Sequence, residues 1–313
     1  MKLDFVRGHM GGNLIVLVKG EQIPEGVELE TGLKLLSPNY LYAHEVGILY
    51  PTESPGELKV KIAEPTSNCF ISACGGFTQV LGAALVETEL GDLFGVEKKE
   101  PFTDVLLHTE GGTVALKIET SGGKVTRIKT DMSSFVRESY ERGVQKLEFE
   151  GLEVMQAGKF LVINADWFKS AYPWADFEKW DQRTREKIIA IQRRFIEVTG
   201  EDEYNLALYD WNPEHGKDMR IVFPHSLEAE YFEPSCGTGT VALGIAVLAQ
   251  GELAAQGVSN SGNVVLRIEC GGGKELGGPE VTELEMNLEE GGVNEAFLSH
   301  SNVEITAVGE AWL

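Results

Sequence analysis

Two uncharged apolar runs, at residues 80–86 and 240–248, interrupt an otherwise mixed pattern of apolar and polar residues. A segment that is apolar on every side is expected to form a helix buried inside a domain. Both runs are shorter than the roughly 20 apolar residues that a membrane span needs. Gly251 follows the second run, at a position where glycine commonly ends a helix. The pattern therefore predicts two buried helices, one in each half of the chain.

Short segments rich in β-branched residues surround both runs and predict strands. The expected strands are 2–6, 14–18, 58–62, 105–108, 114–118, 125–130, 152–155, 160–164, 205–209, 220–223, 264–270 and 303–308. Residues 138–150 are polar and irregular in pattern, and we expect the crossover between two domains there. Residues 167–200 form an insertion without a counterpart in the first half. An amphipathic helix is expected at 181–198, from the helical spacing of Ile188, Ile191, Phe195 and Ile196.

The chain contains an internal repeat. A shift of 162 positions (236 − 74) places Cys74 on Cys236 without a gap. The other matched pairs are Val60 and Val222, Phe70 and Phe232, Gly75 and Gly237, Thr78 and Thr240, Leu81 and Leu243, Gly82 and Gly244, and Ala84 and Ala246. Downstream, residues 114–124 resemble residues 264–274. Two copies are too few for a solenoid, so the repeat predicts a duplicated domain with one cysteine at the start of each buried helix.

Charge and cysteine content narrow the range of partners. The chain has 313 residues, with 27 Lys and Arg against 49 Asp and Glu, a net charge of −22. A nucleic acid or an anionic membrane surface is therefore an unfavourable partner. Asp4 and Arg7 stand where a signal peptide would have its apolar core. Four cysteines do not make a disulfide framework in a chain of this length. We expect a cytoplasmic protein with reduced thiols that binds a small molecule, and the sequence leaves open whether it forms a homodimer.

Three interpretations of the cysteines compete. A free cysteine is often a small buried hydrophobe, and this interpretation fits Cys270 in the strand 264–270 and also Cys69. Metal ligation fits poorly, because no Cys-x-x-Cys occurs and the six histidines are scattered. Cys74 and Cys236 precede the buried helices, where unpaired N–H groups and the helix dipole stabilise an anion. This position is expected to lower the pKa of a thiol and to bind a carboxylate.

Residues next to the two cysteines complete a candidate site. The N–H groups that would bind a carboxylate belong to the turns that contain Gly75, Gly76, Gly237 and Thr238. Asn13 follows a Gly-Gly turn and is either a residue on the rim of a cavity or an ordinary turn residue. His44 lies in an apolar setting, where a lone histidine is usually a core residue with one hydrogen bond.

Two reactive thiols presented by equivalent helix starts suit one chemistry, the inversion of a stereocentre next to a carboxylate. One thiolate removes the Cα proton from one face while the opposite thiol delivers a proton to the other. The N–H donors stabilise the charge that develops on the carboxylate as the carbanion forms.

The run Cys236-Gly-Thr-Gly239, after an acidic lead-in and before an Ala-rich helix, resembles the second cysteine motif of the diaminopimelate epimerase and proline racemase superfamily. The resemblance covers most of the chain. Gly12-Asn13 and the following strand are similar to the opening of that family. The segment Asn205-Leu-Ala-Leu208 resembles the Asn-led strand ahead of the second cysteine, and 303–310 is similar to the closing strand.

The resemblance implies an α/β (α+β) fold with two pseudo-symmetric domains, each a mixed, curled sheet around a central helix. The domains would be 1–140, with 303–313 returning to it, and 141–302. It further implies an isomerase, a cofactor-independent amino-acid racemase or epimerase without metal or pyridoxal, acting from the cleft between the domains. Cys74 and Cys236 would be the catalytic acid and base, and Asn13 and Asn205 would bind the substrate.

Three departures from the family pattern leave the substrate open. The first motif, usually Cys-Gly-Asn-Gly or Cys-Gly-His-Gly, reads Cys74-Gly-Gly-Phe77 here. The Gly-Asn-Pro-His of the second half is replaced by Gly158-Lys-Phe160, and residues 225–235 lack the Glu-Arg pair of diaminopimelate epimerases. Two alternatives therefore remain beside the racemase. One is an isomerase that shifts a double bond in an unsaturated carboxylic acid, and the other is a small-carboxylate binding or redox-sensing protein without turnover.

Overall fold

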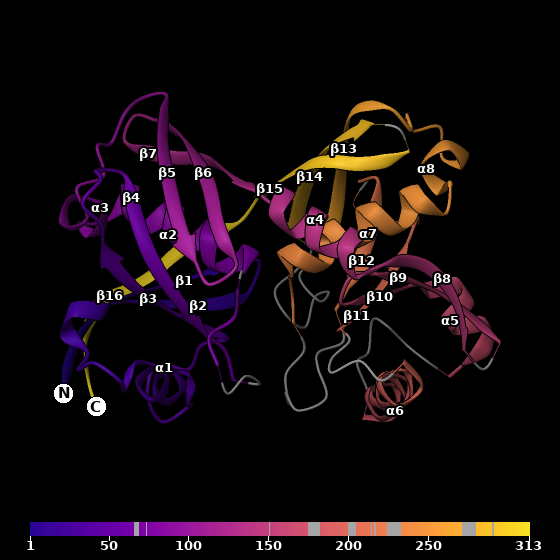
Figure 1. Cartoon of the computed structure of the whole chain (residues 1–313), viewed down its shortest axis with the longest axis horizontal. Coiled ribbons are helices and arrows are strands. Elements are labelled where there is room, and N and C mark those ends of the chain that lie inside the picture. The colour runs from indigo at the N-terminus through magenta and orange to yellow at the C-terminus, as the bar shows by residue number, and fades with distance from the viewer. Residues whose placement is uncertain are drawn as a thin grey trace. The chain divides into compact units, whose positions relative to one another are not determined.

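The structure, a computed structural model, describes residues 1–65, 69–72, 74–149, 151–174, 182–199, 205–213, 215, 217–223, 233–270, 280–289 and 291–313. The chain divides into two compact units (Figure 1). Unit 1 is Met1–Asp131 with Leu298–Leu313, and unit 2 is Met132–Phe297. The domains expected from the sequence are 1–140 with 303–313 and 141–302. No helix of the described residues is long and apolar enough to cross a membrane.

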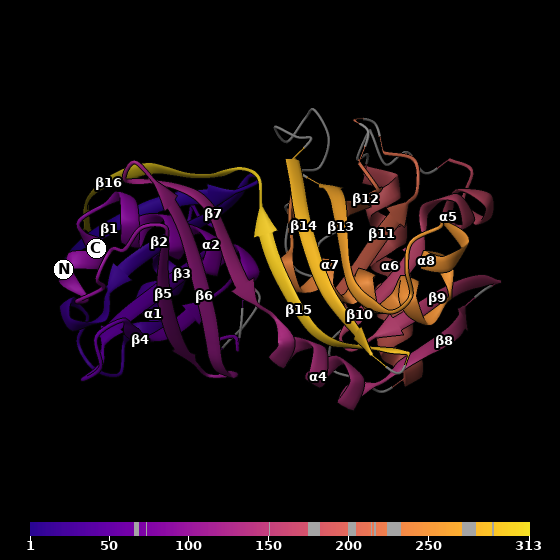
Figure 2. The ribbon, with the colours of Figure 1, turned by 90° about the horizontal axis from the view of Figure 1, so that it is seen from above.

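Unit 1 is a mixed sheet wrapped around one helix. Its strands are β1 (Lys2–Met10), β2 (Asn13–Lys19), β3 (Glu45–Pro51), β4 (Glu57–Ala63), β5 (Phe102–Thr109), β6 (Gly112–Ser121), β7 (Lys124–Asp131) and β16 (Val303–Trp312). They lie in the order β16-β1-β2-β3-β4-β5-β6-β7. The helices are η1 (Gly20–Gln22), α1 (Glu28–Leu36), α2 (Gly75–Glu87) and α3 (Leu90–Leu93). The closing strand β16 pairs with β1, which brings the two chain ends together in this unit (Figure 2).

Unit 2 repeats this architecture. Its strands are β8 (Val144–Phe149), β9 (Leu152–Ala157), β10 (Phe160–Asn164), β11 (Asn205–Asp210), β12 (Met219–Val222), β13 (Gly262–Cys270), β14 (Glu280–Glu289) and the greater part of β15 (Gly292–His300). They lie in the order β15-β14-β13-β12-β11-β10-β9-β8. The helices are α4 (Ser133–Arg142), α5 (Ala165–Ala171), α6 (Gln182–Thr199), α7 (Gly237–Ala249) and α8 (Glu252–Ala255).

The pairing of the strands shows that the two units share one plan. Along β1 to β6 the successive pairs are antiparallel, parallel, antiparallel, parallel and antiparallel. Along β9 to β14 the same sequence of pairings occurs. Helix α2 connects the parallel strands β4 and β5, and α7 connects β12 and β13 in the same way. The duplication predicted from the sequence is therefore present in the topology.

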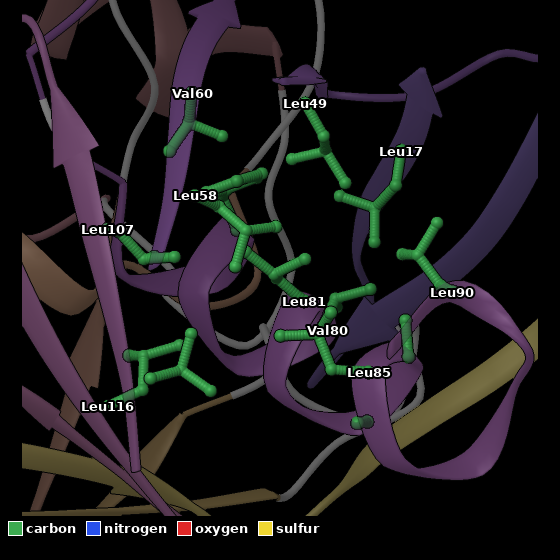
Figure 3. Packing of buried hydrophobic residues seen from close by; sticks show 14 of the residues in the cluster. Leu17, Leu49, Leu58, Val60, Val80, Leu81, Leu85, Leu90, Leu107 and Leu116 are labelled. Atoms are coloured by element: carbon green, nitrogen blue, oxygen red, sulfur yellow. The ribbon is translucent and has the colours of Figure 1, made fainter. Parts of the chain in front are cut away.

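The central helices are buried on all sides, as their composition predicts. Around α2, apolar side chains of the curled sheet converge on Val80, Leu81 and Leu85 (Figure 3). Glycine keeps the strands close to both helices. A Cβ on Gly82 would lie 2.9 Å from Ile128 of β7, and one on Gly244 would lie 2.6 Å from Leu284 of β14. Gly251 has a φ of 72° and follows the C-cap residue Gln250 of α7, in agreement with the predicted helix end.

The polar, irregular sequence pattern at 138–150, where we expected the crossover between domains, covers the end of α4 and the whole of β8. The hydrophobic pattern does not predict α4, because this helix buries little apolar surface. Its buried residues are Ser133, Val136 and Ser139. Residues 280–289 and 292–300, where no strand range was predicted, form β14 and β15. In β14 every second residue is buried, from Thr282 to Leu288, and this alternation is the sequence signal of a half-buried strand.

The segment 167–200 does have a counterpart in the first half. Between β2 and β3 the chain forms α1, whose Leu35 and Leu36 pack on the face of the sheet opposite α2. Between β10 and β11 it forms α5 and α6, whose Phe168, Ile188 and Ile191 pack with side chains of β9, β10 and β11. The predicted amphipathic helix is thus confirmed as α6. Phe195 and Gly200 lie outside the residues whose side chains are described.

Candidate active site

Cys74 is the N-cap of α2. Its backbone is extended, with φ −147° and ψ 120°, and its Sγ accepts the N–H of Phe77 at 3.3 Å. The thiol thus satisfies one of the backbone donors that every helix leaves unpaired in its first turn. The side chain is half-buried, and Gly75 and Gly76 behind it are buried.

Glu45 is the residue of this site that the sequence pattern did not single out. It begins β3, is only 7% exposed, and hydrogen-bonds with Cys74 and Asn13. Burial, and secondly the charge of Glu64, raise the pKa of Glu45 to about 8, although both hydrogen bonds act to lower it. Its Oε2 has no hydrogen-bond partner among the described residues. Glu45 is therefore a carboxyl group that titrates close to neutral pH next to a thiol.

Asn13 and His44 are buried in the same site and contact each other. Asn13 is 1% exposed, its Oδ1 lies 2.9 Å from Nδ1 of His44, and its Nδ2 is 3.1 Å from the place where Gly76 would carry a Cβ. Asparagine at position 76, which the family motif often has, would meet Asn13 here. Burial, and secondly the charge of Arg7, lower the pKa of His44 to about 4, so this histidine is neutral. His44 is a buried residue, as expected, with more than one polar contact.

The parallel pairing of β2 with β3 explains why these groups meet. Ile15 pairs with Glu45, so Asn13 and Glu45 stand at the same end of adjacent strands. Helix α2 begins at this end of the sheet, with Cys74 hydrogen-bonded to Glu45 and Gly76 next to Asn13. The structure thus brings together four of the predicted residues, Asn13, Cys74, Gly75 and Gly76, and adds Glu45.

Cys236 is the N-cap of α7 and repeats the geometry of Cys74. Its φ is −138° and its ψ 116°, and its Sγ accepts the N–H of Gly239 at 3.4 Å. The hydroxyl of Thr238 lies 3.4 Å from the same sulfur. Gly237 is buried, and Thr238 is half-buried. Cys236, Gly237 and Thr238 are therefore together at one helix start in unit 2.

The expectation that this position lowers the thiol pKa is wrong for Cys236. Burial, and secondly the charge of Glu233, raise the pKa of Cys236 well above its usual value. The hydrogen bonds from Thr238 and from the N–H of Gly239 act in the opposite direction but are outweighed. Cys236 is therefore a neutral thiol at physiological pH.

Glu233 makes the surroundings of the two cysteines unequal. It forms an isolated antiparallel bridge with Phe223 ahead of α7. In unit 1 the corresponding bridge joins Ile62 and Ile71, so Glu233 stands where the first copy has an apolar residue. The carboxyl group next to Cys74 comes from a neighbouring strand, whereas the one next to Cys236 precedes it by three residues.

Asn205 begins β11, at the step of the fold where Glu45 begins β3. It pairs with Phe160 of β10, and its N–H donates to the carbonyl of Lys159 at 2.8 Å. The side chain is half-buried. Its role as a substrate ligand, and that of Thr238, remain predictions.

The other two cysteines differ from each other. Cys270 is buried, as expected, with its Sγ 3.3 Å from the hydroxyl of Thr282, and burial raises its pKa to about 12. Cys69 is exposed, so the expectation of a buried hydrophobe is wrong there. Among the described residues no cluster of His, Cys, Asp and Glu is arranged as a metal site. The segment 225–235, whose departure from the family pattern was noted, is described only from Glu233 on.

Neither a protein-family model nor a curated protein sequence matches the chain. Solved structures do. A hydroxyproline epimerase from Agrobacterium vitis, with bound trans-4-hydroxy-L-proline, has a TM-score of 0.66 at 13% identity, over 99% of this chain and 91% of that one. A phenazine biosynthesis protein of the PhzF family from Bacillus anthracis has a TM-score of 0.67 at 12% identity, over 100% of both chains. A methylitaconate-delta-isomerase has a TM-score of 0.63 at 14% identity, over 99% of this chain and 95% of that one.

These similarities confirm the fold implied by the resemblance, that of the diaminopimelate epimerase and proline racemase superfamily. At 12–14% identity they show the fold alone.

Proposed function

We propose that the protein is a cofactor-independent isomerase that inverts the Cα of an amino acid or a related carboxylate. The main support is that Cys74 and Cys236 cap equivalent helices in two copies of one fold. The sulfur of each accepts a hydrogen bond from a backbone N–H of the first turn. A pair of thiols at such positions is suited to remove and return a proton at one carbon. The structures of a hydroxyproline epimerase and a methylitaconate-delta-isomerase on the same fold support an isomerase.

Each residue has a defined part in the proposed reaction. The thiolate of Cys74 takes the Cα proton, and the electron pair left on Cα delocalises into the carboxylate. The N–H groups of the helix starts hydrogen-bond to that carboxylate and stabilise its added charge. The neutral thiol of Cys236 gives its proton to the opposite face of Cα, which leaves Cys236 as thiolate and Cys74 as thiol. Reaction of the other enantiomer runs these steps backwards.

Glu45 supports the generation of the Cys74 thiolate. A carboxyl group with a pKa of about 8 is a matched proton acceptor for a thiol at neutral pH. When Glu45 is ionised, it takes the proton of Cys74 along their hydrogen bond and becomes neutral. Cys236 starts as the proton donor, because burial and Glu233 keep its pKa high.

Isotope exchange tests this proposal. Incubation with candidate amino acids in deuterated water should place deuterium at Cα of the substrate, and Cys74→Ala and Cys236→Ala should each abolish racemisation. Serine should be nearly as damaging, because a hydroxyl is far less acidic than a thiol. Cys69→Ala, which alters an exposed cysteine that caps neither helix, is the matched control and should retain activity. Full racemase activity in both catalytic variants would refute the two-thiol mechanism.

A second candidate function is the shift of a double bond in an unsaturated carboxylic acid. Glu45 favours it, because one carboxyl group near neutral pKa beside Asn13 can move a proton within a single substrate without a second thiol. Ultraviolet absorbance separates the two functions, since a double-bond shift changes conjugation and racemisation does not. Absorbance change with unsaturated di- or tricarboxylates, kept in Cys236→Ala and lost in Glu45→Gln, would establish the second function over the first.

A protein that binds a carboxylate without turnover is the remaining alternative. Alkylation rates address it, because a catalytic cysteine is expected to react faster than a model thiol once it is activated. If Cys74 reacts no faster than a model thiol between pH 7 and pH 9, and no candidate acid exchanges deuterium, the binding protein is the better description.

A further inference from the structure

Helix α2 contains a buried amide side chain that the proposed chemistry does not use. Gln79 is 0% exposed, and its amide makes three hydrogen bonds. Its Nε2 donates to Oγ1 of Thr130 at 2.8 Å and to the carbonyl of Leu298 at 3.3 Å. Its Oε1 accepts the backbone N–H of His300 at 3.3 Å.

These three partners stand at the two places where the chain passes between the units. The chain leaves unit 1 after Asp131, one residue beyond Thr130, and it returns at Leu298. One side chain of α2 therefore holds the last part of β7 and the last residues of β15, where the chain has returned to unit 1. Arg127 of β7 joins the same two segments, with its Nε donating to Oγ of Ser299 at 3.1 Å.

In the second copy of the helix, the equivalent position is equally buried but carries no amide. The shift of 162 positions places Val241 of α7 on Gln79 (79 + 162 = 241), and Val241 is also 0% exposed. The threonine one residue before this position and the glycine three residues after it are the same in both helices. A buried amide costs free energy unless its hydrogen bonds are made, so a polar residue at this position only in unit 1 indicates a role in that unit.

A chain of hydroxyl groups continues from Gln79 to the start of the helix. Oγ1 of Thr130 accepts from Gln79 and lies 2.9 Å from Oγ1 of Thr78, which donates to the carbonyl of Gly75 at 2.8 Å. The directions agree throughout: the amide donates to Thr130, Thr130 to Thr78, and Thr78 to Gly75. Hydrogen bonds in such a series reinforce one another in a buried site. The series ends next to Cys74.

We propose that Gln79 is a positioning residue that couples the two strand ends at the unit crossings to the N-terminus of α2, and thereby to Cys74. Apolar packing allows a buried helix to shift against its neighbours, whereas directional hydrogen bonds with defined lengths hold one position. Cys74 keeps its place beside Glu45 as long as the ends of β7 and β15 remain bound to Gln79. The consequence for catalysis rests on the proposed function, but the coupling itself does not.

Two substitutions separate the parts of this network. Gln79→Met keeps the size of the side chain and, like Val241, removes the amide. Thr130→Val keeps the shape of the residue and removes the hydroxyl that accepts from Gln79 and donates to Thr78. The bonds of Gln79 to Leu298 and to the His300 N–H remain. Leu81→Met is the matched control, because Leu81 is a buried residue of the same helix without a side-chain hydrogen bond.

Two measurements without substrate test the coupling. In Gln79→Met, hydrogen exchange of the peptide that contains the end of β15 should accelerate about tenfold, as expected for the loss of one backbone hydrogen bond. Alkylation of Cys74 followed by mass spectrometry should accelerate about threefold because the loosened helix start is more accessible, while alkylation of Cys236 stays unchanged. Thr130→Val should reproduce the effect on Cys74 and keep the end of β15 protected.

The proposal is overturned if Gln79→Met and Leu81→Met give the same exchange and alkylation rates. If Gln79→Met does not fold, Thr130→Val decides, and an unchanged alkylation rate of Cys74 in that variant also overturns the proposal. Where the wild-type protein turns over a substrate, Gln79→Met should lower kcat about tenfold and leave KM within a factor of about two. Absence of any wild-type turnover would refute the proposed function and leave the exchange and alkylation results to decide the coupling.

Discussion

Replacement of Glu45 by glutamine should change the stability of the protein in a pH-dependent way. The pKa of this carboxyl group is about 8 in the folded protein, against an ordinary value of 4.5. Between these two pH values the folded protein holds a proton that the unfolded chain has released. Wild-type stability should therefore fall as pH rises through this window, by about 1.4 kcal/mol per pH unit at most.

The whole window spans about 3.5 pH units (8 − 4.5), so the maximal effect is about 5 kcal/mol. Below pH 4.5 the carboxyl group is protonated in both states and contributes no pH dependence. Above pH 8 it is ionised in both states, and the cost of burying its charge is complete. Glutamine stays neutral throughout. Glu45→Gln should thus match the wild-type protein near pH 5 and exceed its stability by several kcal/mol at pH 9, while it loses activity.

Urea denaturation followed by far-ultraviolet circular dichroism from pH 5 to pH 9 measures this difference. Subtraction of the two proteins cancels the titration of all groups that they share. Glu64→Gln is the control: it keeps Glu45 but removes the second cause of its raised pKa, so its stability should still fall with pH over a window that ends at lower pH. A constant difference between Glu45→Gln and wild type across the pH range would show that Glu45 is ionised at its site throughout, and the role given to it would be wrong.

Three further predictions follow from single contacts. Alkylation of Cys236 at pH 7 should be slow, and Glu233→Gln should accelerate it, because loss of the negative neighbour lowers the thiol pKa and raises the thiolate fraction. Gly244→Ala should destabilise unit 2 by about 1–3 kcal/mol in thermal unfolding, because the new Cβ would lie 2.6 Å from Met286 Sδ. Cys270→Ala should cost about 1–2 kcal/mol and leave activity unchanged, since it removes a small buried group whose thiol contacts Thr282 and caps neither helix.

Local pattern was enough to predict the central elements and the duplication. The two uncharged apolar runs became α2 and α7, because a segment without a polar face can only be buried. The gapless match of Cys74 with Cys236 predicted equivalent positions, and both residues proved to be helix N-caps. Elements with weak patterns were missed. Helix α4 buries mainly small side chains, and α1 was hidden because only its last turn carries buried leucines.

The chemistry of the site depended on contacts between residues distant in the chain. Glu45 begins an apolar strand, and a single charge in such a run was the available signal. Its partner Cys74 is 29 positions away and meets it only after β3 has paired with β4, the strand that precedes α2. The sequence pattern correctly predicted that Cys236 stands at the start of a helix. It also predicted a lowered thiol pKa, whereas the pKa of Cys236 is raised. Desolvation depends on everything packed around a group, and no local motif contains that information.

The sequence by itself thus determined the repeat and the two capping cysteines, because these follow from periodicity and from matches along the chain, while its resemblance to a known superfamily implied the fold class. Only the tertiary structure decided which carboxyl group stands beside each thiol, the direction of the Cys236 pKa, and the three hydrogen bonds of Gln79. Those properties arise from burial and from the meeting of distant strands, and their energies exist only once the sheet has closed around the helix.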